Sequence, residues 1–253
     1  MKKTALLLAG LLFAVRPLVA QPAGGPVPGM DLSLVRLFGK DLAFSAKATT
    51  KTTDANGKNL EIAMNFAKAD QKVRVDVDLT QIKGDAIPAA MLASLSQMGM
   101  AKVSSITALD SKLTYVIYPG IQSYSKSPLP EAQANALANE LKMKKTELGK
   151  ETIDGHPCVK NKVVITAEDG TEHETTVWNA SDLKDFPLQI ETLENKTLMS
   201  LHFSDINLKA PAASQFEPPA GYTAYNSMQE LMMAAMKKMM GNPPPVDAPV
   251  IKQ

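Results

Sequence analysis

The sequence predicts a mainly β fold of the α+β class, in which an incomplete antiparallel β-barrel, or strongly curved sheet, has helices over its concave face. Between Leu42 and Leu208, apolar residues recur at every second position in many segments, which is typical of strands with one apolar face. Asn56-Gly57 and Asp169-Gly170 are dipeptides that favour tight hairpin turns between such strands. A few segments with helical spacing interrupt the strands and are candidates to cover the apolar face of the sheet.

The first twenty residues have the pattern of an export signal. Lys2 and Lys3 precede an apolar run at residues 4–15 that is too short to span a bilayer, and cleavage is expected after Ala20. We therefore predict a signal peptide at 1–20, a flexible leader at 21–29, a single domain at 30–241 and a Pro-rich disordered tail at 242–253. The mature chain is expected to be periplasmic or extracellular, without a transmembrane segment.

Charge and composition exclude several classes of function. Removal of residues 1–20 takes away three basic and no acidic residues, which leaves 24 basic against 26 acidic side chains and a net charge of −2. A nearly neutral chain with 5% aromatic residues lacks the basic surface typical of nucleic-acid binding. Its one cysteine, Cys158, excludes an internal disulfide, and we expect a buried thiol, with an intermolecular disulfide as the alternative.

Alternation of apolar and polar residues defines the expected strands. The expected strands cover residues 41–52, 60–66, 72–79, 103–109, 113–118, 121–125, 146–152, 158–167, 171–178, 187–193 and 197–208. The clearest is 72–79, where Val73, Val75 and Val77 face one way and Arg74 and Asp76 the other. Successive strands of this kind predict an antiparallel meander.

Four segments are expected to be helical instead, namely residues 30–38, 86–100, 131–144 and 228–240. The second begins at Pro88 and places its apolar residues at helical spacing. The last has Ser227 and Glu230 in the pattern of a capping box and ends at Gly241. These helices are the predicted cover of the sheet.

Three short motifs resemble a known family. They are GKETIDG at 149–155, the stretch around Trp178, Asp182-Leu183 and Phe186-Pro187-Leu188, and FEPPAGY at 216–222. The chain resembles an uncharacterised, DUF-type relative of the periplasmic outer-membrane lipoprotein carrier (LolA/LolB-like) superfamily, over residues 30–240. This resemblance implies an incomplete barrel whose concave cavity takes the acyl chains of a lipoprotein.

An apolar cavity between sheet and helices is the candidate site. Burial of one methylene group contributes about 0.8 kcal/mol, so a long acyl chain gains on the order of 10 kcal/mol before ordering costs. The predicted lining is Phe44, Ile62, Met64, Phe66, Val73, Val75, Val77, Met91, Leu95, Leu201, Phe203, Met232 and Met236. The alternative is a core that the helices fill completely, so that nothing binds there.

The Met-rich segment at 228–240 leaves further alternatives open. A methionine stripe suits ordinary packing, a lid or docking surface for an envelope partner, or Cu(I) binding through thioether sulfurs. His156, His173 and His202 lie on separate predicted strands, so the spacing indicates no catalytic or zinc site. We predict a non-enzymatic binding protein without a cofactor, whose ligand is a lipid or lipoprotein acyl chain. The alternative is a structural or interaction protein of the envelope.

Overall fold

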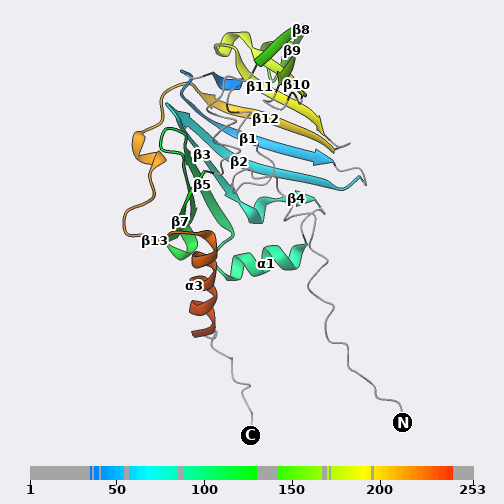
Figure 1. Cartoon of the computed structure of the whole chain (residues 1–253). Helices are drawn as coiled ribbons and strands as arrows, with labels where there is room; N and C mark the ends of the chain where they lie inside the picture. Colours follow the sequence, from blue (N-terminus) through cyan, green and yellow to red (C-terminus); the bar gives the residue numbers. More distant parts are fainter. Residues whose placement is uncertain are drawn as a thin grey trace, which may run out of the picture.

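One large, open β-sheet forms the body of the protein (Figure 1). The computed structural model describes residues 35, 37–39, 41–53, 57–84, 88–129, 142–166, 170, 172–194 and 197–241. In these residues thirteen strands form a single sheet with the order β13-β7-β6-β5-β3-β2-β1-β12-β11-β10-β9-β8, and β4 pairs with β2. The end strands β13 and β8 do not pair with each other, so the predicted incomplete barrel is confirmed.

The strand boundaries follow the predicted alternation closely in most of the sheet. The strands are β1 (Phe44–Thr53), β2 (Asn59–Ala69), β3 (Lys72–Asp78), β4 (Lys83–Gly84), β5 (Lys102–Ala108), β6 (Leu113–Tyr118), β7 (Ser123–Pro128), β8 (Lys142–Ile153), β9 (His156–Thr166), β10 (Glu172–Ala180), β11 (Phe186–Glu194), β12 (Thr197–Asn207) and β13 (Thr223–Tyr225). All pairings of described strands are antiparallel except that of β13 with β7. Asp154 and Gly155 both have positive φ at the β8–β9 turn, as a tight type I′ hairpin turn requires.

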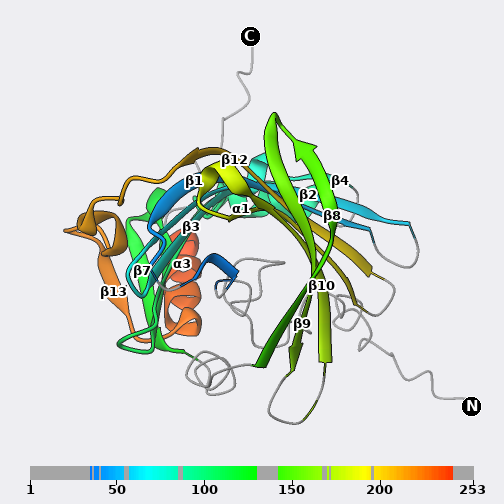
Figure 2. The same ribbon diagram turned by 90° about the horizontal axis from the view of Figure 1, so that it is seen from above.

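The sheet curves into an arc, and its concave face carries the larger apolar cluster. Figure 2 shows the strands along the arc, with the short segment before β1 and helix α3 (Met228–Gly241) on the inner side. The inward residues of β1, β2 and β3, among them Phe44, Phe66 and Val75, join those of β9 to β12 in one buried cluster. Burial of these side chains is the main driving force for the fold.

A second, smaller cluster lies on the opposite, convex face. Ala67, Ile106 and Ile117 lie on β2, β5 and β6, and Phe216 from the 3₁₀ turn η5 (Ala213–Phe216) packs on them. This turn belongs to residues 208–222, the strap, which leads from β12 across the convex face to β13 (Figure 1). The strap and β13 therefore connect the middle of the sheet to one of its edges.

The two α-helices of the described residues contribute unequally to the core. Helix α1 (Ala89–Gln97) falls within the predicted helix 86–100, but none of its residues is buried, and it lies beyond the end of the strands (Figure 1). A side chain on Gly120 would clash with the Gly99 carbonyl oxygen at 2.2 Å, so the turn after α1 packs directly against the turn after β6. Helix α3 contacts β7 and β13 and buries Leu231.

Two predicted helices need comment. The helix predicted at 131–144 is wrong at its end, because residues 142–144 begin β8 and pair with Val164–Thr166 of β9. Cross-strand pairing overrides the weak helical pattern there, and residues 131–141 lie outside the described part. For the helix predicted at 30–38, the described residues 35, 37 and 38 have 3₁₀ geometry. Helix α3 begins as predicted, because Ser227 Oγ accepts a hydrogen bond from the Glu230 N–H at 3.1 Å.

Candidate ligand-binding face

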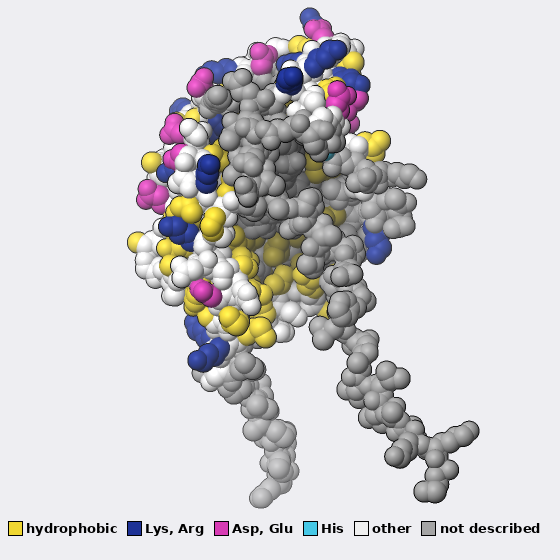
Figure 3. Space-filling model, viewed as in Figure 1, with side chains coloured by type: hydrophobic (Ala, Val, Ile, Leu, Met, Phe, Trp, Pro, Cys, Tyr) yellow, Lys and Arg dark blue, Asp and Glu magenta, His cyan; other side chains and the backbone are white. Residues whose placement is uncertain are grey.

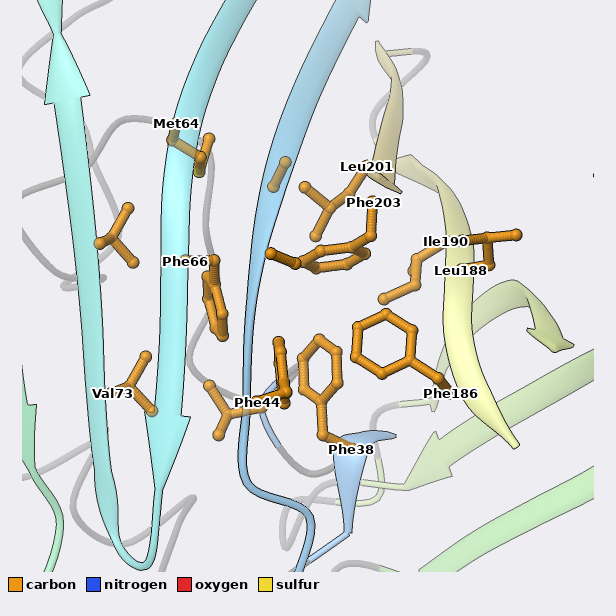
Figure 4. Close-up of a cluster of buried hydrophobic side chains, with 14 of the residues drawn as sticks. Phe38, Phe44, Met64, Phe66, Val73, Phe186, Leu188, Ile190, Leu201 and Phe203 are labelled. Atoms are coloured by element: carbon orange, nitrogen blue, oxygen red, sulfur yellow. The ribbon is translucent and has the colours of Figure 1, made fainter. Parts of the chain in front are cut away.

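Five phenylalanines fill the centre of the concave face. Phe44, Phe66, Phe186 and Phe203 project from β1, β2, β11 and β12 and surround Phe38 (Figure 4). The ring centroid of Phe38 lies 4.8–5.6 Å from the four others, in tilted and edge-to-face arrangements. These distances are those of favourable aromatic pairs. This part of the face is therefore packed by the protein's own Phe38.

The predicted cavity residues divide into two groups. The strand residues Phe44, Ile62, Met64, Phe66, Val73, Val75, Val77, Leu201 and Phe203 all lie in the concave cluster. The helix residues do not join them: Met91 and Met236 are exposed, and Leu95 and Met232 are half-buried outside the cluster. The structure therefore brings together the lining that comes from the sheet, but not the lining predicted from the helices.

A row of hydroxyl groups occupies another part of the same face. The cross-strand pairs Val73–Thr107 and Thr107–Thr114 join β3, β5 and β6, and Val75–Ser105 lies beside them. Paired residues share a face of the sheet, so these hydroxyls lie on the concave side with the valines. Ser125 of β7, paired with Val116, continues the row. We call Ser105, Thr107, Thr114 and Ser125 the hydroxyl row.

The hydroxyl row is buried, with each residue at most 6% exposed. In the part of the chain that the structure describes, no protein group forms a hydrogen bond with any of its four hydroxyls. A buried hydroxyl without a partner costs about 1–3 kcal/mol, so such groups call for an explanation. Sequence reasoning missed these residues because it assigned polar positions to the outer face. The sequence did contain a signal, because Thr107 and Thr114 each lie an even number of positions from apolar residues of the same strand.

Lys68 is a buried cation on the same cross-strand line, because it pairs with Val73. It is 3% exposed, and its Nζ donates a hydrogen bond to the Leu42 carbonyl oxygen at 2.9 Å. Burial lowers the pKa of Lys68 from its ordinary value of 10.5, against the raising effect of Asp41 and Asp70. The concave face thus has positive charge and hydroxyls beside its apolar surface.

Helix α3 contributes a methionine to the inner side of the sheet. Met228 packs against the concave cluster, with its Sδ 3.8 Å from the Tyr118 hydroxyl of β6. Burial raises the pKa of the Tyr118 phenol. Farther along the helix, Met233 and Met236 are more than half exposed. Figure 3 shows hydrophobic side chains gathered in the lower half of this view, where Figure 1 places α3.

The polar clusters of the described residues serve to hold strands together. His156 Nδ1 lies 2.8 Å from Asp182 Oδ2, and His202 Nε2 lies 2.8 Å from Asp154 Oδ2. These contacts connect the start of β9 with the 3₁₀ turn η4 (Ser181–Leu183), and the β8–β9 turn with β12. Buried Cys158 donates to the His156 carbonyl oxygen at 3.5 Å, and not to an imidazole. Its thiol is not paired with a base.

No group of three or more His, Cys, Asp or Glu residues that could hold a metal ion occurs among the described residues. Two surface depressions are lined by described residues. One, of about 370 Å³, lies at the β8–β10 end of the sheet, and the other, of about 260 Å³, lies around Arg74 on the convex face. The first has no phenylalanine in its lining, and the second includes Phe66 of the phenylalanine cluster.

One protein-family model matches more than half of the chain. A sequence model described as "Domain of unknown function (DUF4412)" matches residues 44–188, from β1 into β11. The chain belongs to the DUF4412 family. The prediction of a DUF-type relative is confirmed in this respect. None of the curated proteins matches the chain. In the described residues, no helix has the length and apolar character needed to cross a membrane.

Several solved structures are similar to this DUF4412 protein at low sequence identity. A LolA superfamily protein from Nitrosomonas europaea has 11% identity and a TM-score of 0.35, over 73% of this chain and 94% of that one. The Mycobacterium tuberculosis lipoprotein LppX has 14% identity and a TM-score of 0.40, over 71% and 93%. A chain from the complex structure of Pseudomonas aeruginosa MucA/MucB has 18% identity and a TM-score of 0.36, over 77% of this chain and 62% of that one.

Proposed function

We propose that the protein is an exported, non-enzymatic binding protein that shelters the apolar part of a lipid, such as an acyl chain or lipoprotein lipid, on the concave face of its sheet. The hydroxyl row is the observation that carries this proposal. Four buried hydroxyls with no partner among the described residues lie beside valines on the concave face. An apolar ligand with a polar end would supply both missing contacts: hydrocarbon for the valines and hydrogen bonds for the hydroxyls.

The apolar side chains beside the row are the proposed contacts of such a chain. Val73, Val75 and Val77 face inward on β3, and Met64 and Phe66 lie opposite them on β2. Each buried methylene contributes about 0.8 kcal/mol, so contact with eight carbons offers about 6 kcal/mol before ordering costs. The phenylalanine cluster limits the ligand to the β2–β7 half of the face, because Phe38 already occupies the other half.

The test combines ligand detection with removal of two hydroxyls. Native mass spectrometry of the protein purified from the exported fraction is expected to show bound lipid, and the delipidated protein is expected to take up a fluorescent fatty acid. Thr107→Val/Thr114→Val keeps the side-chain shape and removes two hydroxyls. We expect this variant to bind the fatty acid at least about fivefold more weakly, since two lost hydrogen bonds are worth about 1–3 kcal/mol. Its lipid-free form should be as stable as the original or more stable.

Thr49→Val/Thr176→Val is the matched control, because both threonines lie on other strands and are half-buried. It should bind the fatty acid as the original does. A protein that purifies without lipid and does not take up the fatty acid would contradict the proposal. So would a Thr107/Thr114 variant that loses stability but keeps full binding, because the hydroxyls would then belong to the core.

A second candidate function is docking of an envelope partner on α3. Met233 and Met236, each more than half exposed, favour it, because methionine suits adaptable apolar contacts. Deletion of the whole helix would also remove buried Leu231. The sharper test is Met233→Ser/Met236→Ser, which should abolish co-purification of a partner and leave the thermal midpoint within about 2 °C. Unchanged co-purification would exclude this surface.

A further inference from the structure

Strand β8 is a long edge strand of the sheet. It runs for 12 residues from Lys142 to Ile153, pairs with β9 on one side, and ends the strand order on the other. Ten of its residues are exposed. The opposite edge, β13, has three residues and contacts α3. An edge strand offers a row of main-chain N–H and C=O groups that can pair with another strand.

Strand β8 carries four lysines without an ion pair among the described residues. Several lysines of other strands do pair with carboxylates, as in Lys47–Asp205, Lys102–Asp78 and Lys162–Glu174. Among the described residues, Lys142, Lys144, Lys145 and Lys150 of β8 have no such ion pair. Figure 3 shows basic side chains near the top of the view, where Figure 1 places β8 and β9.

The first half of β8 combines these lysines with a depression. Lys142, Met143 and Lys144 line it together with residues of β9 and β10, including Val164, and its volume is about 370 Å³. Met143 is 44% exposed. The register shift between Glu147 and Gly149 ends the regular strand, so 142–147 is the regular edge. Six extended residues span about 20 Å.

From this edge we infer that residues 142–147 of β8 are a docking site for an extended, acidic segment of another polypeptide, which adds to the sheet as the next strand. The incoming main chain would pair with the free edge of β8. Carboxylates at alternate positions would meet Lys142 and Lys144 on one face, and apolar side chains would meet Met143 on the other. The inference rests on the edge alone and is independent of a ligand on the concave face.

Charge argues against a second copy of the chain as the occupant. Residues 142–147 contain three lysines and one glutamate, so two such edges side by side would bring like charges together. An acidic segment would instead bring opposite charges together. Each of its carboxylates could form an ion pair with a lysine that has no carboxylate partner among the described residues. Exposed ion pairs each contribute about 0.2–1 kcal/mol, so several of them together favour an acidic partner over others. Main-chain hydrogen bonds would align that partner along β8.

The probe is a fluorescein-labelled seven-residue peptide of alternating glutamate and valine, titrated with the full-length protein and followed by anisotropy. We expect saturable binding that weakens as salt rises. Lys142→Glu/Lys144→Glu/Lys145→Glu should weaken it at least about tenfold. Lys126→Glu/Lys209→Glu/Lys237→Glu makes the same change of charge at exposed lysines away from β8 and should leave binding within about twofold.

A second probe separates strand addition from simple charge attraction. The same peptide with every main-chain nitrogen methylated keeps every carboxylate but cannot donate main-chain hydrogen bonds from either edge, and it should not bind the wild-type protein. Equal binding of the methylated peptide would overturn the inference. So would equal loss in both triple variants, no binding of the peptide at all, or a dimer in sedimentation that excludes the peptide.

Discussion

Arg74 of β3 donates a hydrogen bond from Nη1 to the main-chain carbonyl oxygen of Gln215 at 2.7 Å, across 141 positions of sequence. The same guanidinium is held by Asp76, with Nη2–Oδ1 at 2.8 Å, and its Nη2 reaches Ser104 Oγ at 3.3 Å. The planar guanidinium group therefore donates hydrogen bonds to three partners. Arg74 fixes the strap to the convex face next to the point where Phe216 packs.

Arg74→Met is expected to loosen the strap. Loss of a charged hydrogen bond lowers the free energy of unfolding by about 1.5–3 kcal/mol, and urea unfolding measures it. Limited proteolysis within residues 208–222 should become faster. Arg74→Lys should restore little of this, because an ammonium group cannot make all three contacts. Lys47→Met, which breaks the exposed pair with Asp205, is the control and should leave stability nearly unchanged. Unchanged proteolysis in Arg74→Met would contradict this role.

Phe38→Ala should open a cavity in the concave face. Phe38 is 4% exposed and contacts four other phenylalanine rings, so its truncation is expected to cost about 3–5 kcal/mol of unfolding free energy. Thermal and urea unfolding measure the loss. Leu37→Ala, at a partly buried neighbour, should cost clearly less. Equal losses of unfolding free energy at the two positions would contradict a particular contribution of the phenylalanine cluster to stability.

Lys68→Met tests the cost of a buried cation through its pH dependence. Because burial lowers the folded-state pKa of Lys68, the unfolded state binds more protons as the pH approaches 10.5. The wild-type protein should therefore gain stability relative to Lys68→Met as the pH rises from 7 through the folded pKa toward 10.5. Urea unfolding of both proteins at several pH values measures this difference in stability. Titration of the other groups is common to both proteins and cancels in the difference. A difference independent of pH would contradict the lowered pKa.

Cys158 is expected to react slowly with thiol reagents in the folded protein. It is 2% exposed, and burial raises the pKa of its thiol, so the thiolate fraction at a given pH is smaller than for a free cysteine. A colorimetric thiol reagent at pH 8 should label the native chain at least about a hundredfold more slowly than the urea-unfolded chain. Labelling at equal rates, or a disulfide-linked dimer on a non-reducing gel, would favour the intermolecular alternative.

Much of the sheet was predictable from local pattern. The alternation Val73, Val75, Val77 defines which face of β3 is buried, and the positive φ of Asp154 and Gly155 follows from turn-forming residues. Nine of the thirteen predicted lining residues lie in the concave cluster for the same reason, since alternation on a strand decides the face. Helix α3 also begins at its predicted capping residues. All of these depend on residues near one another in sequence.

Other features depend on neighbours that are distant in sequence. Residues 142–144 stand at the end of a segment predicted to be helical and form a strand because β9 lies beside them. Thr107 and Thr114 face inward because their register with Val73 places them there, whatever their polarity. Phe38 enters a cluster whose other rings come from four strands.

The sequence by itself thus determined the strands, their turns and the apolar face, because side-chain alternation and turn geometry are local properties of the chain. The tertiary structure decided which polar groups are buried on that face, which segment fills its aromatic end, and which strand ends the sheet among the described residues. These depend on strand register and on contacts between segments far apart in sequence, which no local pattern of residues contains.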